Sequence, residues 1–177
     1  TKKTTKSMFG DIFKSSRENT GANKYGAFKY QSECKCGDQH LMIREVYLKS
    51  CRLTNPVTHT VFNILSGLAM KTVVHDYVLG CYKCKECGKK GVVTVDYGAG
   101  GCEISFGKFH KVSLLSKDKR LFLNHCPISL KKIKGFVVLL KEDGFTKPNY
   151  HPIDKNCQHF AKDLFEMIFS FFENSKY

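Results

Sequence analysis

The residues from Asn156 to Phe160 (NCQHF) place a thiol and an imidazole at the start of an amphipathic stretch. A cysteine in the first turn of a helix lies beside unpaired backbone N–H groups, which favour the thiolate that nucleophilic attack requires. We therefore interpret Cys157 as a candidate nucleophile, with a small buried core residue as the alternative. The apolar residues behind it recur at helical spacing and would bury one face of the helix: Phe160, Leu164, Phe165, Ile168, Phe169 and Phe172.

A thiol nucleophile needs a base, which usually comes from elsewhere in the fold. His159 follows Cys157 by two residues, so on a helix it faces a different direction. Strand-like segments upstream offer His59, His75 and His110. We expect His59 to be the base and His75 to orient it, with His110 as a third candidate. For each of these three, the alternative is a half-buried, hydrogen-bonded histidine of a strand.

The segment Tyr150–Ala161 (YHPIDKNCQHFA) resembles the nucleophile motif of the lecithin:retinol acyltransferase-like (LRAT-like) proteins. These proteins belong to the circularly permuted branch of the NlpC/P60 papain-like superfamily. The same Asn-Cys pattern is similar, less closely, to that of PPPDE-type peptidases. In both families, the resemblance implies, the cysteine heads a C-terminal helix and an upstream strand carries the catalytic histidine. His59 matches that histidine by order and context, and His75 would match a second histidine of the acyltransferase-like proteins.

This resemblance implies acyl transfer in two steps and needs no cofactor for catalysis. Cys157 would attack a carbonyl, His59 would take and later return the proton, and backbone N–H groups at the helix start would stabilise the oxyanion. The predicted activity is that of an acyltransferase or hydrolase acting on a lipid or on an amide or ester carbonyl. The alternatives are a PPPDE-type cysteine (iso)peptidase and a catalytically inactive, zinc-stabilised binding module.

A second group of cysteines has metal-ligand spacing. The segment 81–88 (CYKCKECG) resembles the metal knuckle of rubredoxin-like and zinc-ribbon sites, and the segment 34–36 (CKC) lies at the tip of an earlier predicted hairpin. Structural zinc takes four nitrogen or sulfur ligands in a tetrahedron. Whether Cys81 replaces one ligand stays open, and exposed redox-labile thiols are the alternative. The expected ligands of one structural Zn²⁺ are Cys34, Cys36, Cys84 and Cys87.

Composition bounds the partners and the compartment. The 29 Lys and Arg against 16 Asp and Glu give the 177-residue chain a formal charge of +13, which favours an acidic membrane surface or an acidic protein. Nucleic acid is not expected, because aromatic residues are not interleaved with the basic ones. The sequence has no apolar run of about 18 residues and no secretory signal. We expect an intracellular, cytoplasmic protein with reduced cysteines, with membrane association as an option.

The order of predicted elements points to an α+β fold in which an antiparallel β-sheet precedes C-terminal helices. The resemblance adds a circularly permuted papain-like (NlpC/P60) architecture. Residues 1–24 are polar and predict a flexible N-terminal tail, and residues 25–177 predict a single domain with a cysteine-rich insertion at 81–90. Helical spacing covers Ser129–Leu140 and Cys157–Glu173. Predicted strands cover 27–32, 41–48, 57–65, 71–79, 91–97, 104–106 and 108–115.

Overall fold

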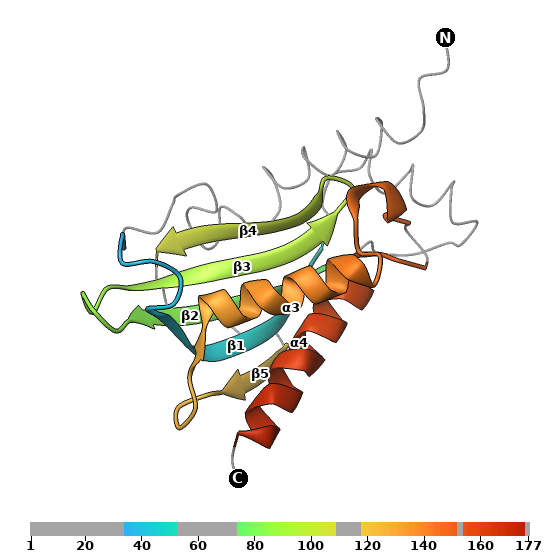
Figure 1. Ribbon diagram of the computed structural model, residues 1–177. Helices are drawn as coiled ribbons and strands as arrows, with labels where there is room; N and C mark the ends of the chain where they lie inside the picture. The colour runs from blue at the N-terminus through green and yellow to red at the C-terminus, as the bar shows by residue number, and fades with distance from the viewer. Residues whose placement is uncertain (1–33, 53–73, 109–117, 152–153, 176–177) are drawn as a thin grey trace.

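Strands come first and helices last in the part of the chain that the structure describes. This computed structural model describes residues 34–52, 74–108, 118–151 and 154–175. Within them an antiparallel sheet carries two long helices, both on the same face (Figure 1). The expected α+β class, with an antiparallel sheet and C-terminal helices, is therefore confirmed.

The sheet has the spatial order β4-β3-β2-β1-β5, and a short sixth strand, β6, pairs with β1. Every pairing is antiparallel. Successive strands from β1 to β4 are therefore neighbours, which keeps the connections simple. The strands are β1 (Leu41–Arg52), β2 (Val74–Cys84), β3 (Lys90–Gly98), β4 (Gly101–Lys108), β5 (Lys119–Phe122) and β6 (Ile128–Ser129).

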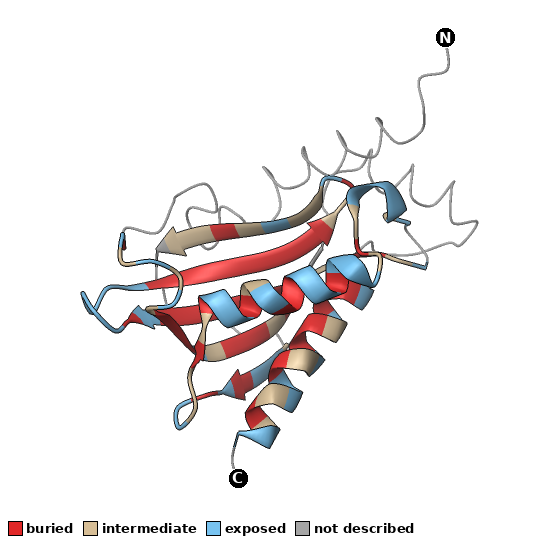
Figure 2. Ribbon diagram, viewed as in Figure 1, coloured by how far each residue is buried: buried red, intermediate tan, exposed pale blue. Residues whose placement is uncertain are grey.

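Two α-helices and a short 3-10 turn complete the described chain: α3 (Leu130–Glu142), η1 (Lys147–Asn149) and α4 (Cys157–Asn174). Ser129 caps α3, because its Oγ accepts a hydrogen bond from the Lys132 N–H at 3.2 Å. The inner sides of both helices are buried against the sheet, as Figure 2 shows. The buried residues of α4 behind its first turn are Phe160, Ala161, Leu164, Phe165, Ile168 and Phe172.

The alternation of side chains along the strands produces two apolar layers. Val78, Val93 and Val95 belong to the main core with the helices. A separate cluster contains Tyr47, Tyr77, Leu79, Cys81 and Val92. Because successive strand residues point to opposite faces, these two sets lie on the two sides of the sheet. Strand β3 is consequently buried from Gly91 through Tyr97, which accounts for its β-branched run.

Strand β2 extends further than the sequence predicted. The prediction ended the strand at Leu79, whereas pairing with β1 and β3 continues to Cys84 and Lys83 respectively. The cysteine-rich turn is therefore shorter than expected. Several expectations lie outside the described residues: the N-terminal tail at 1–24, the strands at 27–32 and 57–65, and most of the strand at 108–115. Among the described helices, none has the length and apolarity needed to cross a membrane.

A leucine-to-alanine substitution should lower the stability of the protein more in the core than on the surface. Leu164 of α4 is 0% exposed and Leu139 of α3 is 48% exposed. We expect Leu164→Ala to lower the free energy of unfolding by about 2–5 kcal/mol, because it leaves a cavity under α4. Leu139→Ala, the matched control, should change it by about 0.5 kcal/mol or less. Urea unfolding measures both, and equal losses would contradict the assignment of α4 to the core.

Candidate active site and cysteine cluster

Cys157 is the first residue of α4, as the sequence predicted. Asn156 caps the helix: its Oδ1 accepts hydrogen bonds from the Gln158 N–H at 2.9 Å and the His159 N–H at 3.2 Å. Its carbonyl accepts the Phe160 N–H at 3.1 Å. No acceptor for the Cys157 N–H is found among the described residues.

The start of α4 is fastened to the start of β2. The Gln158 side-chain Nε2 donates to the carbonyl oxygen of Val74 at 3.4 Å, and the next residue on β2 is His75. Cys157 is only 4% exposed, and the side chain of His75 is 15% exposed. The thiol and the imidazole therefore meet in a site that largely excludes water.

Cys157 lies near enough to His75 to act on the pKa of its imidazole. Burial by itself lowers the pKa of the His75 imidazole, but Cys157 and then Asp96 act in the opposite direction and hold this pKa well above its ordinary value of 6.5. The Nδ1 atom of His75 is buried and has no hydrogen-bond partner within strict geometric limits among the described residues.

Asp96 supplies a third group that the sequence analysis missed. It lies on β3, next to β2, and its Oδ2 is 3.9 Å from the Nε2 of His75. Asp96 is buried. A signal was present, because Asp96 is the one acidic residue in the otherwise uncharged run Gly91–Tyr97. A carboxylate retained in a strand buried on both faces needs a partner, and here His75 is one.

Tyr150, which precedes Cys157 in the chain, lies near the same thiol. Antiparallel hydrogen bonds join the His151 N–H to the Lys155 carbonyl at 2.9 Å and the Lys155 N–H to the His151 carbonyl at 3.2 Å. This tight loop turns the chain back and brings Tyr150 near Cys157. Burial first, and then the charge of Cys157, raise the pKa of the Tyr150 phenol, which therefore stays protonated and able to donate.

An aromatic cluster packs next to the candidate site. The Tyr97 ring lies 5.3 Å from the Tyr150 ring, 5.5 Å from the Phe160 ring and 5.4 Å from the Phe145 ring, measured between centroids. The Tyr97 hydroxyl donates to the Thr146 carbonyl at 2.8 Å. Such edge-to-face and tilted contacts fix the rings relative to one another. The loop before α4, the start of α4 and the end of β3 are thereby held together.

The structure thus brings together two of the three residues that the sequence proposed for catalysis, Cys157 and His75. His59, the expected base, and His110, the third candidate, lie outside the described residues, so their assignments stay predictions. His75 was expected to orient the base; the structure places it near Cys157, and its role stays a prediction. The Asp96 carboxylate lies next to it.

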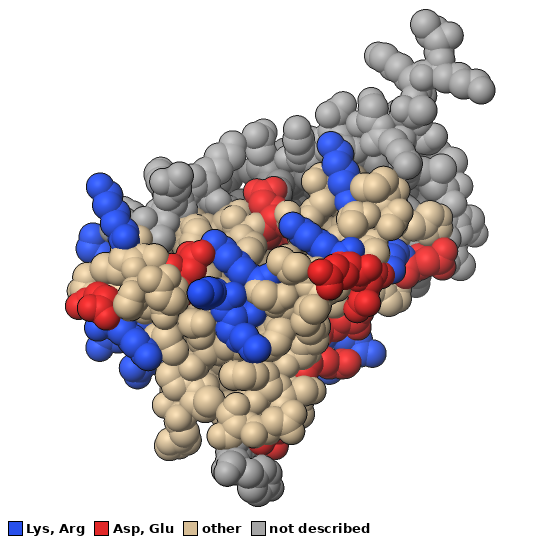
Figure 3. Space-filling view, viewed as in Figure 1, with Lys and Arg blue, Asp and Glu red and all other residues tan. Residues whose placement is uncertain are grey.

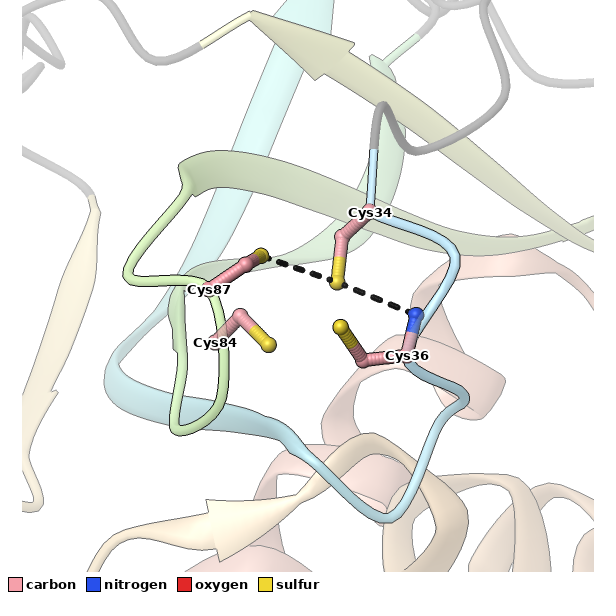
Figure 4. Close-up of side chains that lie close together, drawn as sticks. All are labelled: Cys34, Cys36, Cys84 and Cys87. Atoms are coloured by element: carbon pink, nitrogen blue, oxygen red, sulfur yellow. Dashed lines mark hydrogen bonds between the residues drawn. The ribbon is translucent and has the colours of Figure 1, made fainter.

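Four cysteines converge at the other end of β2. Cys34 and Cys36 precede β1, whereas Cys84 ends β2 and Cys87 lies in the turn that follows it. Figure 4 shows the four sulfur atoms pointing toward one another from these two segments. All lie within 4.8 Å of one another, and the sulfurs of Cys34 and Cys87 are 3.5 Å apart. The four cysteines that the sequence predicted as ligands are therefore close enough together to hold a metal ion.

The geometry fits a tetrahedral ion. Zinc–sulfur bonds of about 2.3 Å in a tetrahedron put the sulfurs about 3.8 Å apart, close to the separations in this cluster. Gly88, with φ of 71°, allows the tight turn that follows Cys87. Cys81 takes no part, because it packs in the cluster on the opposite face of the sheet with Tyr47 and Leu79. Cys81 and Cys84 are three residues apart on β2, so their side chains point to opposite faces of the sheet.

The protonation of the cluster also suits a metal. Backbone N–H donation from Cys87, ahead of smaller contributions, lowers the pKa of Cys84 to about 6. A hydrogen bond with Cys34 raises the pKa of Cys36 to about 12, and burial raises the pKa of Cys34. One thiolate therefore forms readily at Cys84, whereas the hydrogen bond with Cys34 and burial favour the protonated forms of Cys36 and Cys34. A divalent cation would displace those protons.

Comparisons with known proteins assign neither a family nor a fold: no protein-family model, no curated protein and no solved structure matches this chain.

The geometry around His75 predicts how Cys157 responds to pH. Asp96→Asn removes a charge that raises the His75 pKa, while the opposing effect of burial remains, so this pKa falls. The imidazolium then stabilises the thiolate less, and alkylation of Cys157 by iodoacetamide at mildly acidic pH should slow by roughly tenfold. At alkaline pH the difference should vanish, because the His75 imidazole is neutral in both proteins.

Glu166→Gln is the matched control for this measurement. Glu166 is an exposed acid of the same helix as Cys157, and it pairs with Lys162 at 3.8 Å. Peptide mapping by mass spectrometry gives the labelling rate of each cysteine. Equal rates for Asp96→Asn and the unmodified protein at mildly acidic pH would show that Asp96 does not act on the site.

Proposed function

We propose that this protein is a thiol-dependent acyl-transfer enzyme in which Cys157 is the nucleophile, His75 the general base and Asp96 the orienting carboxylate. The observation that carries the proposal is the convergence of these three groups from α4, β2 and β3 in one buried site. Nucleophilic catalysis needs a thiol and an imidazole that lie close together, and here two separate elements carry them. A third group that orients the imidazole completes it.

In the first step His75 takes the Cys157 thiol proton as the sulfur attacks a carbonyl carbon, and the carbon–sulfur bond forms as electrons move to the carbonyl oxygen. The donors that we propose for that oxyanion are the Cys157 N–H and the Tyr150 hydroxyl. Collapse of the intermediate breaks the bond to the leaving group, which takes a proton from the His75 imidazolium. Water, an alcohol or an amine then attacks the thioester, gives its proton to His75 and releases Cys157.

The order of elements supports the LRAT-like resemblance as part of this proposal. The nucleophile heads the last helix, and the histidine lies on an earlier strand of an antiparallel sheet. On this basis we propose a circularly permuted papain-like (NlpC/P60) architecture and an acyl-bearing lipid or protein as substrate. A PPPDE-type cysteine peptidase uses the same two groups and is the second candidate.

We further propose a structural Zn²⁺ at the four cysteines, separate from catalysis. The donor set is all sulfur, and four thiolates leave no open position for a substrate. Bound there, the ion would tie the segment before β1 to the β2–β3 turn. It would thereby fix one end of the strand whose other end carries His75.

The proposal predicts a covalent acyl-enzyme. Mixing the protein with a p-nitrophenyl ester should release a burst of p-nitrophenol near one equivalent, and intact-mass analysis should locate the acyl group on Cys157. Cys157→Ser should fold normally, because it changes one atom at the helix end, and should lose the burst. His75→Ala should slow acylation by about 10²–10⁴-fold.

His125→Ala is the histidine control, since His125 is exposed in the loop between β5 and β6, and it should acylate at the normal rate. A folded His75→Ala protein that acylates normally would exclude His75 as the base. An absent burst in a folded protein would leave the inactive binding module in place of the enzyme.

Zinc content tests the cluster independently of activity. Elemental analysis of protein refolded with zinc should give about one ion per chain, and Cys36→Ser should lose most of it because one of four ligands is gone. Cys126→Ser, outside the cluster, should retain the ion. A content near zero in the unmodified protein, or equal content in both variants, would exclude this site.

A further inference from the structure

A groove of about 480 Å³ lies at the β2–β3 turn, away from the candidate active site. Strand β2 separates the two places: His75 is near its start and Cys84 is its last residue, a distance of about 30 Å along an extended chain. The groove wall comes from β1, from the end of β2 with its turn, and from Pro127. Its charged lining consists of Arg44, Lys83, Lys85 and Glu86. Acyl transfer at Cys157 makes no use of it.

A β-bulge places Arg44 in this groove. The register of β1 against β2 shifts between Ile43 and Glu45, so Arg44 is left out of the ladder. Its carbonyl instead accepts a hydrogen bond from the Leu123 N–H at 2.7 Å. A bulge re-aims the side chain of the extra residue, and here Arg44 is exposed beside Ile43, which is fully buried.

The cations of the groove are not used by the rest of the described structure. Arg44, Lys83 and Lys85 are exposed, and none has an ion-pair partner among the described residues. Glu86, the acid of the lining, is engaged by the His40 Nδ1 at 3.1 Å. The exposed charged side chains of the lining are therefore three cations and one paired acid, and Cys84 and Cys87 of the four-cysteine group lie beside them. Figure 3 shows Lys and Arg side chains gathered over the end of the molecule where the β2–β3 turn lies in Figure 1.

We propose that this groove binds a short acidic peptide segment of a partner protein. Arg44 offers a planar, bidentate donor set for a carboxylate, and Lys83 and Lys85 offer further charge. Met42 and Pro127 supply apolar surface for a neighbouring side chain of the peptide. No aromatic side chain lines the groove, so bases of a single-stranded nucleic acid would find no stacking platform. An acidic segment with an interspersed apolar residue fits this lining best.

Fluorescence anisotropy tests the proposal on the full chain. The probe is a fluorescein-labelled peptide of about ten residues containing glutamate and leucine, compared with the same peptide carrying glutamine in place of glutamate. The acidic peptide should bind saturably and weaken with added salt, whereas the glutamine peptide should not bind. Arg44→Gln should weaken binding about tenfold, since it removes a charge-assisted contact.

Lys131→Gln is the matched control, because Lys131 is an exposed cation of α3 outside the groove. It removes the same charge and should change the affinity less than about twofold, because its side chain does not line the groove. Thermal melting of both variants establishes that they fold.

Three results would overturn the proposal. Equal weakening by Arg44→Gln and Lys131→Gln would mean nonspecific attraction to a chain of net charge +13. Saturable binding of a single-stranded RNA oligonucleotide, weakened by Arg44→Gln and tighter than that of the peptide, would make the groove a nucleic-acid site. Absence of saturable binding by the acidic peptide would leave the groove without this function.

Discussion

The attachment of the start of α4 to the end of the sheet is the interaction on which the candidate active site depends. Phe160 anchors the first turn of the helix in the aromatic cluster of Tyr97, and Gln158 joins that turn to Val74. The Asn156 cap fixes where the helix begins. Because one helical turn rises about 5.4 Å, a shift of the helix by that amount would separate Cys157 from His75. The core of the protein therefore sets the distance between thiol and imidazole.

Strand β2 links the two chemical centres of the molecule. Its start carries His75, and its end carries Cys84 of the four-cysteine group. Its middle is buried on both faces, with Val78 in the main core and Leu79 in the cluster on the opposite side. A metal that fixes the β2–β3 turn would reduce fraying at one end of this strand. The thiol site at the other end would gain from that rigidity without contacting the metal.

Much of this architecture follows from local sequence signals. The apolar spacing behind Cys157 predicted α4, and the β-branched run in Gly91–Tyr97 predicted β3. The cysteine spacings predicted the four-sulfur group, because metal ligands are few in kind and their separations are short. His75 and Cys157 are far apart in the sequence, and no local pattern ranks His75 above His59 as the partner of the thiol. Asp96 was missed for the same reason, since its partner lies on a neighbouring strand.

The central claim is that Cys157 acts on the His75 imidazole within a largely buried site. The most direct measurement is an NMR titration of the His75 ring nitrogens in isotopically labelled protein. The account predicts that the pKa of His75 lies well above 6.5 and falls when Cys157 is replaced by alanine. A His75 ring that titrates near its ordinary pKa, and does so identically in Cys157→Ala, would contradict it.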